Sequence, residues 1–359
     1  MAKIMVALSG GVDSAVAALK LLQQGHQVGA VYARTWLKDD DFLAECPAKE
    51  DIENASAVSK HLGIPFTILS VVKEYRQRIV DYLVAGYRQG LTPNPDIMCN
   101  REMKFGILRD HAIAQGYDGF ATGHYCQIER NDQGVPIVLE GADPNKDQSY
   151  FLAMVLSDQL KNAYFPIGTM EKSNVRAIAR TEGLPNADRK DSQGICFLGK
   201  TNINQFLSEF IPDHPGPIVN HQNKVVGEHR GLHQYTIGQR KGIGVPSNTD
   251  HQAYVVVGKD LTNHTLKVAF DEHRENALFT ERVLLRDLNW QVQPSRNHKF
   301  LHAKVRYRDA ATPIETISHP DGTVEVIFRE KQRAIARGQV LAFYESNQLL
   351  GGGFYEKIY

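Results

Sequence analysis

A short loop rich in glycine and serine near the N-terminus carries the clearest chemical signal. Ser9-Gly-Gly-Val-Asp-Ser14 follows an apolar run at 3–8 and begins a segment, 12–22, whose apolar residues recur at helical spacing. Glycines let backbone amides approach phosphate oxygens closely, serine hydroxyls add donors, and a helix N-terminus attracts anions. The loop lacks the lysine of a Walker A motif and the spacing of a dinucleotide fingerprint. We therefore favour phosphate binding over a tight turn that holds no ligand.

A second candidate site surrounds Cys99. In Thr92-Pro-Asn-Pro-Asp-Ile-Met-Cys-Asn100, two prolines prevent a continuous helix and place Asp96 three residues before the cysteine. At the start of the next helix the dipole would stabilise a thiolate, and the nearby acid could move a proton. The alternative is a buried, unreactive cysteine after a structural turn. The acid beside Cys99 favours a catalytic role.

The other three cysteines give weaker signals. Cys196 ends Asp191-Ser-Gln-Gly-Ile-Cys196, which by itself could equally be a core strand. Cys46 follows an acidic run in what we interpret as a solvated loop, and Cys126 follows the end of a strand, so we expect no chemistry from either. Because no Cys-x-x-Cys pair occurs, a zinc ribbon or an iron–sulfur cluster is not expected, and the sequence offers no dedicated set of metal ligands.

The overall charge of the chain is balanced. The 41 Lys and Arg residues equal the 41 Asp and Glu residues in number, so bulk charge would not draw the chain to nucleic acid, and any such site must be a local patch. An acid-free stretch contains five cations: Arg296, Lys299, Lys304, Arg306 and Arg308. If this stretch is a strand, Lys304, Arg306 and Arg308 lie on one face with His302. A face with charges of one sign favours binding of RNA phosphates over the alternative of a solvated surface without a ligand. Arg240, Lys241 and residues 333–337 could extend this basic face.

Length and composition limit the class of protein. With 359 residues, 42% hydrophobic and 23% charged, the chain should form two or three globular domains, not a coiled coil or a disordered tail. No run of about 18 apolar residues occurs, and the N-terminus lacks a cleavable signal pattern. We expect a cytoplasmic protein that does not span a membrane.

Strand-like and helix-like segments alternate through the first half of the chain. We expect strands at 3–8, 28–32, 66–71 and 119–122, and helices at 12–22, 50–62, 74–88, 101–114 and 172–181. This alternation predicts an α/β domain with a doubly wound, Rossmann-like parallel sheet at 1–203. A Pro/Gly-rich stretch at 211–217 marks the entry to a small central α+β domain, 204–269. From about residue 270 the period changes to two, which predicts a small antiparallel barrel or sandwich over 270–359.

The motifs together resemble a known family. The loop at 9–14 after an N-terminal strand resembles the pyrophosphate loop of the ATP pyrophosphatases, which attach AMP to a carbonyl-type oxygen. The whole chain is similar to the tRNA-specific 2-thiouridylases, which thiolate the wobble uridine of tRNA. The further motifs that carry this resemblance are Asn94-Pro-Asp96 with Cys99, Thr122-Gly-His-Tyr125, Lys146-Asp-Gln-Ser-Tyr-Phe151, Asp191-Ser-Gln-Gly-Ile-Cys196, Gly238-Gln-Arg-Lys-Gly242, Arg306-Tyr307 and Gly351-Gly-Gly353. The resemblance implies an adenine nucleotide alpha hydrolase-like first domain and a C-terminal β-barrel.

The resemblance also implies binding residues. The ATP site, with Mg²⁺ expected beside the nucleotide, would comprise Ala7, Leu8, Ser9, Gly10, Gly11, Val12, Asp13, Ser14, Ala33 and Gly123. Many relatives have a methionine where this chain has Ala33, so only a backbone contact to the adenine would survive there. Asn94, Pro95 and Asp96 would meet the flipped target base. The remaining tRNA contacts would be His124, Lys146, Asp147, Gln148, Arg306, Tyr307 and Gln339.

The implied reaction uses two cysteines. ATP would adenylate the C2 oxygen of the uracil, because an amide-like oxygen is a poor leaving group and AMP is a good one. A persulfide on Cys196, loaded by an upstream sulfur relay or cysteine desulfurase, would deliver sulfur to C2. Cys99 would be the nucleophile that frees the transferred atom, with Asp96 beside it, and a Cys99–Cys196 disulfide would remain. The enzyme would act as a monomer.

Two other interpretations remain open from the residues. Another ATP pyrophosphatase, acting on a small carboxylate or amide, would need neither Cys99 nor Cys196. A non-catalytic nucleotide- or RNA-binding module would bind ATP without releasing pyrophosphate.

Overall fold

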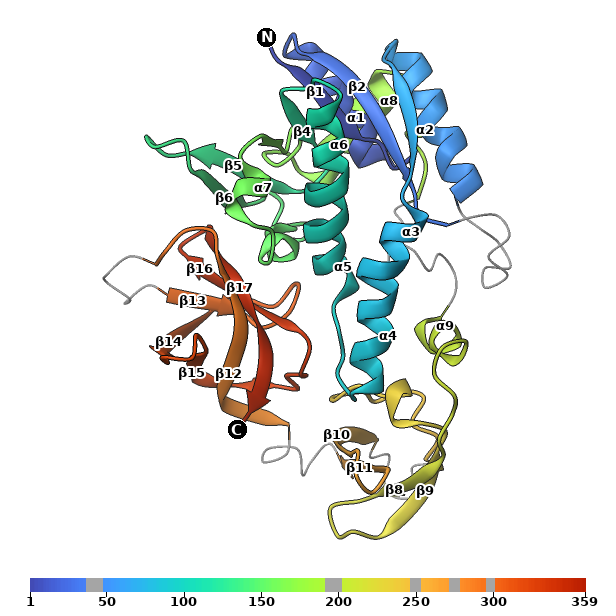
Figure 1. Cartoon of the computed structure of the whole chain (residues 1–359), viewed down its shortest axis with the longest axis vertical. Helices are drawn as coiled ribbons and strands as arrows, with labels where there is room; N and C mark the ends of the chain where they lie inside the picture. The colour runs from blue at the N-terminus through green and yellow to red at the C-terminus, as the bar shows by residue number, and fades with distance from the viewer. Residues whose placement is uncertain (37–47, 191–201, 246–252, 271–277, 295–300) are drawn as a thin grey trace.

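The computed structural model describes residues 1–36, 48–190, 202–245, 253–270, 278–294 and 301–359. In this part of the chain three β-sheets follow one another, and helices flank the first (Figure 1). None of the described helices combines the length and the apolar character needed to cross a membrane.

The N-terminal sheet is parallel. Its strands are β1 (Lys3–Ala7), β2 (Gln27–Arg34), β3 (Phe66–Ser70), β4 (Gly119–Ala121) and β7 (Ala163–Tyr164), in the order β3-β2-β1-β4-β7. Successive side chains of β1 point to opposite faces, so Ile4 and Val6 join one buried cluster and Met5 joins another. Both faces are therefore covered, which confirms the predicted doubly wound α/β architecture.

Helices pack on the two faces of this sheet (Figure 1). One face carries α1 (Val12–Gln23), α2 (Ala48–Leu62) and α8 (Lys172–Thr181). The other carries two continuous helical stretches: α3 (Val72–Tyr75), η1 (Arg76–Val80) and α4 (Asp81–Arg88), then α5 (Pro95–Met98), η2 (Cys99–Leu108) and α6 (Arg109–Ala114). The helix expected from Arg101 thus begins at Pro95, because a proline is tolerated at the first helical position and Asn94 caps it there.

A hairpin after β4 links the first sheet to the C-terminal one. It consists of β5 (Cys126–Arg130) and β6 (Pro136–Glu140), and η3 (Ser149–Leu152) and α7 (Ser157–Leu160) follow it. β6 pairs with the last strand of the chain, with Val138 opposite Leu349. No local sequence pattern predicted this long-range pairing.

The central region is built mainly of strands. α9 (Ile203–Ser208) packs Phe206 and Leu207 against the core of the first sheet. It is followed by β8 (Gly216–Val219), β9 (Val225–His229), η4 (Leu232–Gln234), β10 (Tyr254–Asp260) and β11 (Thr265–Phe270). The sheet order is β10-β11-β8-β9, with β8 and β11 parallel. The domain boundaries at 203 and 269 stay predictions.

The C-terminal sheet closes on itself. Its strands are β12 (Phe279–Trp290), β13 (Leu301–Lys304), β14 (Thr312–Ser318), β15 (Val324–Arg333), β16 (Val340–Glu345) and β17 (Gln348–Ile358). They run in the order β12-β15-β14-β13-β16-β17, and pairing of β12 with β17 completes a barrel. The predicted antiparallel barrel is confirmed, and the sandwich alternative is wrong.

One detail of the barrel corrects the sequence analysis. β13 ends at Lys304, the chain turns over residues 305–308, and Arg308 has a positive φ of 69°. Lys304, Arg306 and Arg308 therefore do not share a strand face. The predicted continuous basic face is wrong, because the alternation of residue types continues beyond the end of the extended backbone.

Candidate active site

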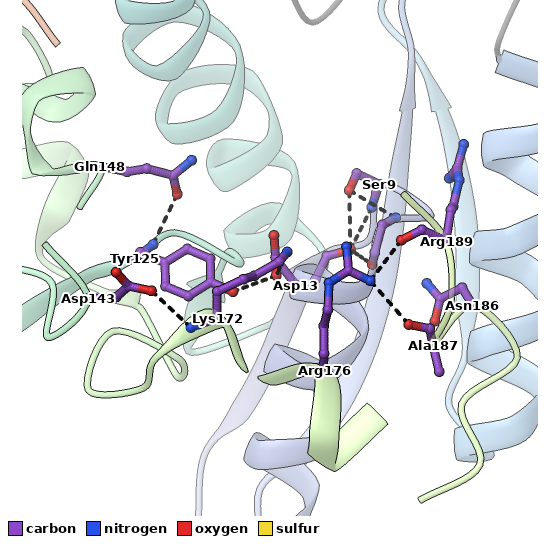
Figure 2. Close-up of polar contacts among 12 residues, drawn as sticks. Ser9, Asp13, Tyr125, Asp143, Gln148, Lys172, Arg176, Asn186, Ala187 and Arg189 are labelled. Atoms are coloured by element: carbon purple, nitrogen blue, oxygen red, sulfur yellow. Dashed lines mark hydrogen bonds and ion pairs between the residues drawn. The ribbon is translucent and has the colours of Figure 1, made fainter. Parts of the chain in front are cut away.

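The loop after β1 is held in shape by its own hydroxyl groups (Figure 2). Ser14 Oγ accepts a hydrogen bond from the Ser9 amide at 3.2 Å and donates to the Gly11 carbonyl at 3.0 Å. Ser9 Oγ lies 3.2 Å from Ser14 Oγ and accepts from the Gly11 amide at 3.4 Å. The loop ends at the start of α1, where backbone amides and the helix dipole favour an anion.

Gly10 is the tightest point of the loop. It has a φ of 80°, and a Cβ there would lie 2.5 Å from the Asp51 carbonyl oxygen and 2.9 Å from Arg189 Nη1. The Gly10 carbonyl accepts from Asn186 Nδ2 at 2.9 Å, and Arg189 is hydrogen-bonded to the Asp51 carboxylate. Residues from α2 and from the segment after α8 thus enclose the loop.

A buried lysine lies on the other side of the loop (Figure 2). Lys172 Nζ contacts Asp13 Oδ1 at 2.7 Å, and the same oxygen accepts from the Tyr125 hydroxyl at 2.7 Å. The lysine side chain is 11% exposed and that of Asp13 is 33% exposed. The backbone amide of Lys172 donates to Asp143 Oδ2 at 3.1 Å, which fixes the start of α8. Sequence reasoning missed Lys172, because it belongs to no motif and is 159 residues from Asp13.

The other residues predicted to bind ATP surround the same loop. Gly123 packs so closely that a Cβ would lie 2.8 Å from the Ser14 amide nitrogen. Leu8 and Val12 are buried in the core, so only their backbone could meet a nucleotide. Ala7 and Ala33, on adjacent strands, are both partly buried.

Cys99 lies one helical turn inside its helix. Asn94 caps the helix by accepting from the Ile97 amide at 3.2 Å, and Pro95 occupies the first position. Asp96 and Cys99 are both half-buried and three residues apart, so they lie on the same side of the helix. The expectation that Cys99 begins the helix is therefore wrong, and the dipole acts on it less strongly than predicted.

The remaining cysteines divide into two groups. Cys126 is buried, and burial together with the charge of Asp147 raises the pKa of its thiol, which agrees with the structural role predicted for it. Cys46 and Cys196, with the segment before Cys196, lie outside the described residues.

Two of the predicted RNA contacts come together from distant parts of the chain. Asn94 Nδ2 lies 3.3 Å from Gln339 Oε1, and Gln339 Nε2 donates to the Thr92 carbonyl at 2.7 Å. The barrel thus touches the chain where the helix of Cys99 begins. Pro95, the residue after Asn94, is buried.

His124 is an interior residue. Its ring is 5% exposed, Nδ1 lies 2.6 Å from Thr122 Oγ1, and Nε2 lies 3.4 Å from Lys104 Nζ. Burial and the nearby Lys104 charge lower the pKa of His124 well below 6.5. Because an ammonium can only donate, Nε2 accepts and Nδ1 carries the proton. Both nitrogens are engaged within the protein, so the predicted direct contact of His124 with RNA is not supported by its position.

Asp147 is likewise buried and joins two parts of the chain. Its carboxylate accepts from the Gly141 amide, from the amide and hydroxyl of Ser149, and from Lys304 Nζ at 2.8 Å. Lys304 also contacts Glu140 Oε1 at 2.6 Å. Asp147 and Lys304 are therefore engaged with each other rather than presented to RNA, contrary to expectation.

The other predicted RNA contacts lie nearer the surface. Tyr307 packs on Phe151 with ring centroids 4.4 Å apart, and the Arg308 guanidinium lies 5.2 Å from the Tyr307 centroid. Arg306 Nε donates to Asp309 Oδ2 at 3.1 Å. Lys146 and Gln148 are half-exposed, and Gln148 Oε1 accepts from the Tyr125 amide at 3.0 Å.

Comparison with known proteins decides the family. Residues 2–200 match the tRNA methyl transferase HUP domain, residues 204–270 the tRNA methyl transferase PRC-barrel domain, and residues 280–354 the aminomethyltransferase beta-barrel domain. A protein of Akkermansia muciniphila named tRNA-specific 2-thiouridylase MnmA is 46% identical over 358 residues, which cover 100% of this chain and 99% of that protein. The chain belongs to the tRNA-specific 2-thiouridylase family. The resemblance predicted from the motifs is therefore confirmed.

Further comparisons agree with this membership. The 2-thiouridylase of Enterococcus faecalis is 42% identical, covering 99% of this chain and 96% of its own length. A solved complex of a 4-thiouridine synthetase with RNA and bound ATP is 20% identical, with a TM-score of 0.38, over 59% of this chain and 50% of that chain. The latter likeness is too slight to assign a ligand to this 2-thiouridylase.

Proposed function

We propose that the chain replaces the C2 oxygen of the wobble uridine of tRNA by sulfur, at the expense of ATP. The family activity, tRNA uridine 2-thiolation by a sulfurtransferase, is the function of this chain. The observation that carries the proposal is the match to 2-thiouridylases along the whole chain, 46% identical to one that it covers from end to end. The phosphate-binding loop after β1 and the capped helix of Cys99 support the two halves of the reaction.

Adenylation would take place above the loop of residues 9–14. The uracil C2 oxygen attacks the α-phosphorus of ATP, the bond to the β-phosphate breaks, and pyrophosphate leaves on the loop. The hydroxyl and amide groups of Ser9, Gly11 and Ser14, which bond to one another within the loop, would turn to the phosphate oxygens, and the N-terminus of α1 would stabilise the negative charge. Lys172 would turn from Asp13 to a phosphate oxygen when ATP binds. The second oxygen of Asp13 is then suited to Mg²⁺, which prefers carboxylate ligands together with phosphate.

Sulfur transfer would follow at the adenylated carbon. The persulfide of Cys196 adds to C2, AMP leaves, and attack by the Cys99 thiolate on Cys196 Sγ breaks the persulfide bond. Sulfur stays on the base, and the Cys99–Cys196 disulfide that remains requires an external reductant. An upstream persulfide carrier would reload Cys196. The chain would act as a monomer in the cytoplasm, where such a carrier and a thiol reductant would be present. Asp96, on the same side of the helix as Cys99, would take up the thiol proton.

The RNA would lie where the barrel meets the helix of Cys99. Asn94, Pro95 and Asp96 would contact the target base, with Gln339 beside them. Tyr307 and Arg306, both half-buried, would contact the neighbouring strand of RNA, because aromatic rings and guanidinium groups stack on unpaired bases.

Release of pyrophosphate from labelled ATP tests the proposal. We expect release that depends on tRNA and stops when the wobble uridine is replaced by cytidine. Release without any tRNA would favour a small-molecule synthetase, and ATP binding without release would favour a non-catalytic module.

A further inference from the structure

A cavity lies where the three parts of the chain meet. Its volume is about 420 Å³. Its walls come from the residues just after α4, from β10, from the start of β12 and from the end of β17. Residues of each part face it, among them Thr92, Lys259, Phe279 and Arg337. No motif of the reaction accounts for it.

Gly90 lines this cavity, and Gly238 and Gly338 each follow a residue that lines it. Gly90, Gly238 and Gly338 have φ values of 71°, 86° and 89°, and a Cβ on each would lie 2.8, 2.6 and 3.0 Å from another part of the chain. These neighbours are Leu261 beyond β10, Ala334 of the barrel and Leu91 after α4, in that order. Because a side chain at any of the three would be strained by the positive φ and crowded by its neighbour, glycine is favoured at these positions. The Gly238-Gln-Arg-Lys-Gly242 motif thereby acquires a structural role.

The charged side chains that line the cavity, Lys259 and Arg337, are both basic. Lys259 Nζ donates to the Gly90 carbonyl at 3.3 Å, and neither Lys259 nor Arg337 pairs with a carboxylate within the described ranges. No Asp or Glu is among the lining residues. Burial lowers the pKa of Lys259 to about 8, so the ammonium is still mostly charged at neutral pH, and no acidic side chain of the cavity lining faces it. An anion is the complement of such a site.

The remaining wall is apolar and adjoins the proposed base-contacting residues. Phe279, Ile335 and Val257 offer a surface on which a sugar or base could pack. The Thr92 amide donates to the Arg337 carbonyl at 2.8 Å, and these residues are two positions from Asn94 and Gln339 respectively. Inorganic phosphate alone would leave the apolar wall uncovered, whereas a nucleotide covers it and fits a cavity of this size.

We infer that this cavity binds a nucleotide of the RNA next to the one that is thiolated, with its phosphate between Lys259 and Arg337. Since this RNA is the substrate of the proposed function, the site deepens that function. A base that leaves its stack needs the flanking backbone to be held, and this site holds it.

Binding of a fluorescent anticodon stem-loop RNA tests the inference. Lys259→Met should weaken binding about tenfold, and its log Kd should vary less steeply with log salt, by about 0.7. Lys259→Arg should keep most of the affinity. Lys267→Met, which removes an exposed lysine of the adjacent strand β11, should match the parent protein.

A second measurement identifies the phosphate. A methylphosphonate is neutral, and one can be placed singly on either side of the wobble nucleotide. Each should lower the affinity of the RNA for the parent protein. At the phosphate that Lys259 binds, the same change should not lower the affinity for Lys259→Met any further. Unchanged affinity and salt dependence of Lys259→Met would overturn the inference, as would independent effects at every phosphate.

Two further results separate this site from other outcomes. If AMP binds the parent protein and not Lys259→Met while RNA affinity stays equal, the cavity belongs to a free nucleotide and the RNA assignment is wrong. If the parent protein thiolates tRNA and Lys259→Met binds it equally well, the proposed function stands and only this site fails. A parent protein that neither binds nor thiolates tRNA would overturn both.

Discussion

The ion pair between Lys304 and Asp147 should hold the β5–β6 hairpin to the barrel, and its removal should cost measurable stability. The Lys304 side chain is 12% exposed and that of Asp147 is 7% exposed, whereas Glu140, the second partner, is 33% exposed. Burial by itself would lower the pKa of Lys304, but hydrogen bonds to Asp147 and Glu140 outweigh it and raise that pKa above its ordinary value. The pair is therefore favourable in place.

The magnitude follows from what each partner would lose. Removing one member of a buried ion pair costs about 3–5 kcal/mol, because the other charge remains buried. In Lys304→Met, Glu140 regains water, but Asp147 keeps only its bonds from Gly141 and Ser149. We expect the free energy of unfolding to fall by about 3 kcal/mol, at the low end of that range. Adding Asp147→Asn removes the buried charge and should restore about 1 kcal/mol.

Urea unfolding followed by tryptophan fluorescence measures this change. Trp290 stacks on Phe343 in the barrel at 4.6 Å, and a Trp36→Phe background makes Trp290 the sole reporter. Lys331→Met is the matched control, since Lys331 lies 3.8 Å from Glu281 and both are more than half exposed. That control should cost less than about 1 kcal/mol. A Lys304→Met variant as stable as the control, or a double variant less stable than Lys304→Met, would refute the reasoning.

Three further changes probe the nucleotide site and the interior. In Gly123→Ala, a Cβ 2.8 Å from the loop backbone should weaken ATP binding about tenfold by calorimetry, whereas Gly258→Ala, with its nearest neighbour at 3.5 Å, should match the parent. Lys172→Met should raise the KM for ATP about tenfold in pyrophosphate release, and an unchanged KM would remove the lysine from the phosphate site. Lys60→Met, at an exposed position of α2, is its control. Burial keeps the pKa of His124 well below 6.5, so the ring is neutral in the folded protein while the unfolded chain binds a proton near pH 6.5. The free energy of unfolding should therefore fall as the pH drops below about 6.5, and His124→Gln should reduce that slope in urea unfolding; an equal slope would contradict this assignment.

The sequence predicted what depends on local pattern. Buried parallel strands are short apolar runs, and the clusters around Ile4 and Met5 show why β1 could be read directly. The loop at 9–14 was found for the same reason, since its residue types, spacing and position after a strand are all local.

Features that depend on distant parts of the chain were not predicted. Lys172 approaches Asp13 only after α8 packs on α1, and the pairing of β6 with β17 leaves no local periodicity. The wrong prediction of a continuous basic face from Lys304 to Arg308 came from a misleading local pattern. The residue types go on alternating through a turn in which Arg308 has a positive φ. Burial of His124 and Asp147 likewise follows from tertiary packing.

Mass spectrometry of tRNA nucleosides, after incubation with ATP, a protein persulfide donor and a thiol reductant, tests the central claim most directly. The parent protein and Cys46→Ser should form 2-thiouridine, with one AMP and one pyrophosphate for each. Cys196→Ser and Cys99→Ser should form none while they still bind ATP. Parental yields of 2-thiouridine from either of these two variants would contradict a sulfur transfer that depends on both thiols.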